Sequence, residues 1–150
     1  MIIDKVFQQL SSSPLMHSPS SPEYLNLEKQ LLDFLKDCEL SERGKGEMDF
    51  WEFGKIKLPY IEMGAISSLE LFGLDELIIF LYYKLNQSTY KRVADIGCNI
   101  GLHSIILSKC GYVVSAYEPD ENHIKLIYKH LEINNISNVQ VNKAAVSDNN

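Results

Sequence analysis

The segment RVADIGCNIGLHS, residues 92–104, constrains the fold of this chain more than any other part of the sequence. It predicts a short strand, a tight turn that contains Gly97 and Gly101, and then a helix. A second strand (residues 112–118), a second helix (118–135) and a third strand (138–146) follow. Strands that alternate with helices at this spacing are typical of right-handed parallel crossovers. We therefore expect an α/β fold with a Rossmann-like, doubly wound parallel sheet.

A ligand of such a sheet lies beyond the carboxyl ends of the strands, where the first turn and the end of the second strand meet. Gly97 and Gly101 let the backbone turn sharply and approach a ligand closely. Glu118 ends the second strand, where a carboxylate accepts hydrogen bonds from both hydroxyls of a ribose. Asp95 lies just before the turn, and a buried carboxylate there needs a partner.

Two classes of cofactor use this geometry. Dinucleotides place a pyrophosphate at the helix N-terminus and favour G-x-G-x-x-G, but Asn99 stands at the second glycine position here. The Asp95 carboxylate would repel a pyrophosphate and would suit a cationic ligand. S-adenosylmethionine carries an ammonium and a sulfonium and no phosphate, so we expect it as the cofactor. A nicotinamide-dependent oxidoreductase is disfavoured, and a Rossmann-like domain that has lost its ligand is the structural alternative.

The same region resembles the FkbM-type methyltransferases, a class I S-adenosylmethionine-dependent family. The resemblance covers about residues 91–148 and is carried by four elements: Asp95-Ile96-Gly97-Cys98-Asn99-Ile100-Gly101, Glu118-Pro119, Asn134-Asn135 and Ala145-Val146-Ser147-Asp148. It implies methyl transfer to an oxygen, often a hydroxyl of a saccharide or another small molecule. It implies that Asp95, Gly97, Asn99, Gly101 and Glu118 contact the cofactor, and that Ala144 and Ala145 pass near the adenine.

The sheet of that family has seven strands, and this chain supplies three. The resemblance therefore implies the first half of the domain (residues 91–150), truncated after the third strand and present as an N-terminal fragment. A strand at the edge of such a sheet invites pairing, so we expect an oligomer or a complementing chain. The alternative function is a non-catalytic binding module built on the truncated sheet.

The first 90 residues predict a cover for this sheet. Residues 1–22 are rich in serine and proline and are expected to be flexible. Residues 23–90 are expected to form a helical and hairpin region, whose first helix starts with Ser21 as N-cap and Pro22 at its first position. The aromatic residues 50–53 are expected to cover the end of a sheet, with a substrate pocket as the alternative.

Composition excludes several classes. The formal net charge is −6 and no basic cluster occurs, so nucleic acid is not an expected partner. The three scattered cysteines predict neither a zinc site nor a disulfide framework, and they favour a cytoplasmic protein. We expect no leader peptide, membrane span or metal cluster. His103 is a candidate base or a packing residue, whereas His123 and His130 are expected on a solvated helix face.

Overall fold

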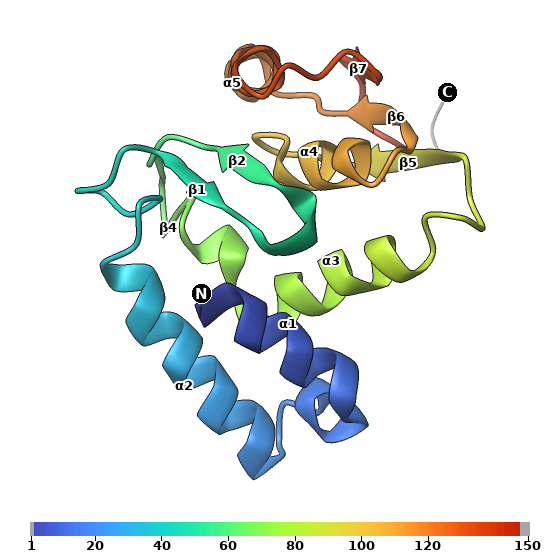
Figure 1. Cartoon of the computed structure of the whole chain (residues 1–150). Coiled ribbons are helices and arrows are strands. Elements are labelled where there is room, and N and C mark those ends of the chain that lie inside the picture. Colours follow the sequence, from blue (N-terminus) through green and yellow to red (C-terminus); the bar gives the residue numbers. More distant parts are fainter. Residues whose placement is uncertain (1, 148–150) are drawn as a thin grey trace. The chain divides into compact units, whose positions relative to one another are not determined.

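The computed structural model describes residues 2–147 and divides the chain into two compact units, Met1–Tyr82 and Tyr83–Asn150 (Figure 1). The division falls inside helix α3 (Leu74–Leu85) rather than at residue 90, where the sequence pattern changes. Asp148, which is part of the motif after the third strand, lies outside the described residues.

The N-terminal unit consists of helices, short 3-10 turns and two small antiparallel hairpins. The helices are α1 (Ile2–Ser12), α2 (Pro22–Lys36) and most of α3, and the 3-10 turns are η1 (Pro14–His17), η2 (Trp51–Phe53) and η3 (Glu70–Phe72). The hairpins pair β1 (Glu47–Asp49) with β2 (Lys55–Lys57) and β3 (Glu62–Met63) with β4 (Ile66–Ser67). As predicted, Ser21 caps α2 by accepting a hydrogen bond from the Tyr24 N–H at 3.0 Å, and Pro22 opens the helix.

The structure differs from the sequence expectation at the N-terminus. Residues 2–12 form α1 rather than a flexible segment, and Ile3, Val6, Phe7 and Leu10 are buried along one face of it. The physical reason lies in the aromatic residues between β1 and β2. The Phe7 ring stacks on Trp51, with the ring centroids 4.3 Å apart, and meets Phe53 edge-on. The hairpin aromatics therefore build the core of this unit together with α1.

The C-terminal unit holds the α/β fold that the sequence predicts. Its strands are β5 (Arg92–Ile96), β6 (Val113–Tyr117) and β7 (Val139–Asn142), and they form a parallel sheet in the order β5-β6-β7. Helix α4 (Leu102–Lys109) connects the first two strands, and α5 (Glu121–Ile133) connects the last two (Figure 1). Among the described residues this unit therefore has a three-stranded, Rossmann-like parallel sheet.

The two faces of this sheet differ in burial. Crossovers of this kind are right-handed, so α4 and α5 cover the same face. Val114 and Ala116 are buried on that face, whereas Val113 and Ile96, which point to the opposite face, are 49% and 60% exposed. Within the described residues, β5 pairs with β6 alone and so forms an edge of the sheet. The structure thus leaves one face and the β5 edge open to further packing.

Helix α5 shows a second difference. Its apolar spacing places Ile124, Ile127, Tyr128 and Leu131 on one face, but Tyr128 is 56% exposed. The buried residues are Ile127, His130 and Leu131, which follow the same i, i+3, i+4 spacing with a histidine in the stripe. The helix is therefore rotated so that a polar ring, and not the tyrosine, faces the core.

Candidate functional site

The turn between β5 and α4 depends on residues with positive φ. Gly97, Asn99 and Gly101 have φ values of 74°, 51° and 90°, a region that glycine enters freely and asparagine tolerates. The Gly101 N–H donates to the Cys98 carbonyl at 2.8 Å, which closes the turn just before α4 starts. A Cβ on Gly97 would meet no atom within 4 Å, so its backbone faces open space. A Cβ on Gly101 would lie 3.3 Å from Ile127 Cγ1.

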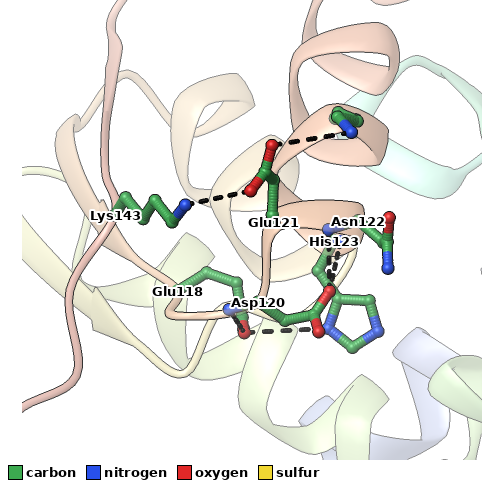
Figure 2. A network of polar contacts seen from close by, with 7 residues as sticks. Glu118, Asp120, Glu121, Asn122, His123 and Lys143 are labelled. Atoms are coloured by element: carbon green, nitrogen blue, oxygen red, sulfur yellow. Dashed lines mark hydrogen bonds and ion pairs between the residues drawn. The ribbon is translucent and has the colours of Figure 1, made fainter.

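Glu118 follows β6 and is buried, and both of its carboxylate oxygens lie in this turn region. Its Oε2 accepts a hydrogen bond from the Asn99 N–H at 2.9 Å, and its Oε1 accepts one from the Asp120 N–H at 3.0 Å. His123 Nδ1 lies 3.7 Å from Oε1, as Figure 2 shows. A carboxylate offers about four acceptor positions, so these two hydrogen bonds leave capacity for two ligand hydroxyls.

Asp95 lies near the carboxyl end of β5 and is half-buried. Its Oδ2 accepts a hydrogen bond from the Ser104 hydroxyl at 2.6 Å, which ties the strand to the first turn of α4. The sequence anticipated a partner for this carboxylate but not this serine. The charges of Asp95 and Glu118 also act together on one neighbour: burial, followed by these two carboxylates, raises the pKa of Cys98 to about 12. The site therefore has a negative potential.

Asn99 projects its side chain from the left-handed position in the turn. Its Oδ1 is buried and makes no hydrogen bond with any described residue. Buried polar atoms in folded proteins usually have partners. An orphaned acceptor within the glycine turn therefore fits a ligand that brings its own donor.

The segment after β7 reaches the same end of the sheet. Ala144 and Ala145, expected near the adenine, are exposed. Lys143, immediately before them, lies with its Nζ 3.1 Å from Glu121 Oε2 in the first turn of α5 (Figure 2). Because both side chains are mostly exposed, this ion pair contributes little to stability.

The three histidines of this unit have different environments. His103 Nδ1 lies 3.0 Å from the Tyr83 hydroxyl and its ring packs edge-on against that tyrosine, which matches the packing alternative for this residue. His123 is half-buried beside Glu118. His130 was expected on the solvated face, and this is wrong: it is fully buried, because its Nδ1 reaches the Ile100 carbonyl at 2.8 Å.

Sequence reasoning also missed Asp120. This residue caps α5: its Oδ1 accepts hydrogen bonds from the Asn122 and His123 N–H groups at 2.8 and 3.0 Å (Figure 2). These bonds lower the pKa of its carboxyl group below the usual value. An aspartate before an apolar helical repeat is a recognisable N-cap signal. The cap matters to the site because the Asp120 N–H holds Glu118.

The described residues show neither a metal cluster nor a membrane-spanning helix. Across residues 2–147, no group of three or more histidine, cysteine, aspartate or glutamate side chains could hold a metal ion. In the same described part of the chain, no helix has the length and apolar character needed to cross a membrane.

The matches to known proteins cover only part of the chain. The family described as "Tellurite resistance protein TehB" matches residues 86–150. The curated "Ribosomal protein L11 methyltransferase" of Acetivibrio thermocellus is 43% identical over 58 residues. That alignment covers 38% of this chain and 18% of the relative, so the chain spans less than a fifth of the relative's length. No solved structure matches the chain significantly.

These matches support a relationship between this chain and the methyltransferase superfamily. The family match, over residues 86–150, covers most of the C-terminal unit, which carries the glycine turn, Asp95 and Glu118. They do not support the FkbM-type family specifically, because neither match is to that group.

Proposed function

We propose that this chain carries the cofactor-binding half of an S-adenosylmethionine-dependent methyltransferase. The observation that carries the proposal is the arrangement around Glu118: a buried carboxylate with spare acceptor capacity, held by the N–H of Asn99 beside the open backbone of Gly97. Glu118 would hold the ribose, and residues 97–101 would approach the methionine portion. The orphaned Asn99 Oδ1 and the negative potential around Cys98 support a ligand that carries donors and positive charge.

The sulfonium of such a cofactor supplies an electrophilic methyl group. What the chain contributes is position: the turn and Glu118 would fix one end of the ligand, and proximity and alignment account for much of the rate in such a reaction. In keeping with the resemblance to the FkbM-type family, we propose a hydroxyl of a small molecule or saccharide as the methyl acceptor. The buried, free cysteines support a reducing, cytoplasmic setting.

We further propose that additional strands complete the sheet at the β5 edge, from another segment, a second copy or a complementing chain. The open face around Ile96 and Val113 supports this. The same surface would serve the non-catalytic alternative, a binding module on a truncated sheet. Cofactor binding separates the two, because a module that acts through this surface needs no cofactor.

The test is calorimetric titration of the complete gene product with S-adenosylhomocysteine, and with NAD as the control ligand. Glu118→Gln keeps the size of the side chain and removes the charge, and we expect it to weaken binding by about tenfold or more. Glu121→Gln is the matched control, because Glu121 is an exposed carboxylate three residues away that pairs with Lys143 and Lys125. If the folded protein binds neither ligand, the proposal of a methyltransferase is refuted. Selective binding of NAD would indicate an oxidoreductase.

A further inference from the structure

A buried histidine touches the glycine turn from α5. His130 is fully buried, and its Nδ1 lies 2.8 Å from the carbonyl oxygen of Ile100. A carbonyl can only accept, so the Nδ1 atom carries the proton and donates. His130 Nε2 is buried without a hydrogen-bond partner among the described residues. The ring is therefore neutral and acts through one donor.

The Ile100 carbonyl needs this donor because of its place in the chain. The first backbone hydrogen bond of α4 runs from the Ile105 N–H to the Gly101 carbonyl at 3.0 Å. The Ile100 carbonyl lies one residue before that bond, ahead of the helix, in a residue whose side chain is completely buried. A buried carbonyl is normally paired, and here the partner is His130, thirty positions later in the sequence.

Helix α5 contacts the turn at a second point, one helical turn earlier. Ile127 packs against Gly101, where a Cβ would meet Ile127 Cγ1 at 3.3 Å. Residues 127 and 130 are three apart and share one face of the helix. On the other side of the turn, the Asn99 N–H donates to Glu118. The turn is thus held by a carboxylate at the Asn99 N–H and by a histidine at the Ile100 carbonyl.

We propose that His130 is a positioning residue of the cofactor site: its hydrogen bond to Ile100 fixes residues 97–101 in the conformation that presents Gly97 and Asn99 to the ligand. The inference rests on the proposed function for its ligand. His130 itself does not touch the ligand. A phenylalanine or leucine would fill the same volume without burying an unpaired Nε2, so the donor is what the histidine adds.

Two substitutions of His130 distinguish the effect of its hydrogen-bond donor from the effect of the volume that its ring fills. In His130→Asn, the amide Nδ2 is bonded to Cγ, as Nδ1 is in histidine, so a donor stays at the same place along the side chain. In His130→Phe, a ring stays and the donor is lost. Leu131→Ala, a cavity in the same helix, is the control for a general loss of stability.

The readouts are the affinity for S-adenosylhomocysteine by calorimetry and the amide hydrogen exchange of Asn99 and Gly101 by NMR, both with the complete gene product. We expect His130→Phe to weaken binding about tenfold and to speed exchange at both amides, and His130→Asn to stay within about threefold of the wild type. We expect Leu131→Ala to leave both readouts close to the wild type.

Unchanged affinity and unchanged exchange in a folded His130→Phe variant would overturn the proposal. Equal losses in the Asn, Phe and Ala variants would also overturn it, because the packing of α5 would then matter and the donor would not. If the wild-type protein binds no S-adenosylhomocysteine, the proposed function fails. The exchange rates then still decide whether His130 holds the turn.

Discussion

The two glycines of the turn offer a sharp test of the site, because their surroundings differ. Both have positive φ, and an alanine held in this left-handed region costs about 1–2 kcal/mol. The Cβ of Gly97→Ala enters open space, so we expect no further loss of stability. The Cβ of Gly101→Ala meets Ile127 Cγ1 at 3.3 Å and Cγ2 at 3.4 Å. Overpacking of this kind adds about 1–2 kcal/mol, at the low end of the usual range.

We therefore expect Gly101→Ala to destabilise the protein by about 2–4 kcal/mol and Gly97→Ala by about 1–2 kcal/mol. Urea unfolding followed by circular dichroism measures both. In an Ile127→Ala background the steric part disappears, so Gly101→Ala should then cost about as much as Gly97→Ala does. Equal costs for the two glycines in the wild-type background would refute this account of the turn.

Ligand binding should show the opposite order once stability is accounted for. Gly97→Ala leaves the fold nearly intact but places a methyl group in the open space that the backbone of this residue faces. We expect it to weaken binding of S-adenosylhomocysteine by about tenfold or more, measured by calorimetry on the folded variant. Unchanged affinity would mean that the cofactor does not approach this backbone.

Three further predictions concern buried groups. Burial lowers the pKa of His130 below its usual 6.5, with Lys129 adding to the shift, so the unfolded chain takes up the proton first as pH falls. Stability should therefore decline below about pH 6.5, by at most about 1.4 kcal/mol per pH unit, and this part of the decline should vanish in His130→Asn. Burial raises the pKa of all three cysteines, Cys38, Cys98 and Cys110, and the pKa reaches about 12 for Cys98 and about 11 for Cys110. Iodoacetamide should therefore modify these thiols at mildly alkaline pH only after the protein unfolds. Labelling of the native protein would contradict their burial. Ser104→Ala should cost about 1–3 kcal/mol in urea unfolding, because Asp95 loses its donor, and no loss would show that water replaces the hydroxyl.

Much of the C-terminal unit could be predicted because each local signal agrees with the fold. The same topology is indicated by the strand-length apolar segments, by the glycines of the turn and by Glu118 at the end of β6. The structure confirms the parallel sheet. The cofactor-binding roles of all the site residues stay predictions: Asp95, Gly97, Asn99, Gly101, Glu118, Ala144 and Ala145. The structure adds which contacts hold them, and those contacts cross between elements far apart in the sequence.

The errors have a common physical origin. The sequence of residues 1–22 shows serine and proline, but it does not show that Phe7 will stack on Trp51. In α5, Tyr128 and His130 compete for the inner face, and hydrophobicity favours the tyrosine. The histidine faces inward because a carbonyl thirty residues earlier lies at hydrogen-bonding distance. Tertiary contacts of this kind override a local periodicity and cannot be read from it.

The sign and size of the charges around the turn favour a cationic ligand over a dinucleotide. The N-terminus of α4 contributes roughly +0.5 of an elementary charge. Asp95 and Glu118 together contribute two negative charges, and both add to the effect of burial in raising the pKa of Cys98. A pyrophosphate would add two more negative charges to a site that is already negative. A ligand with a sulfonium, an ammonium and a single carboxylate brings a net positive charge, and its carboxylate can still use the helix end. The charges of these residues therefore favour the cationic cofactor of the proposed function over a dinucleotide.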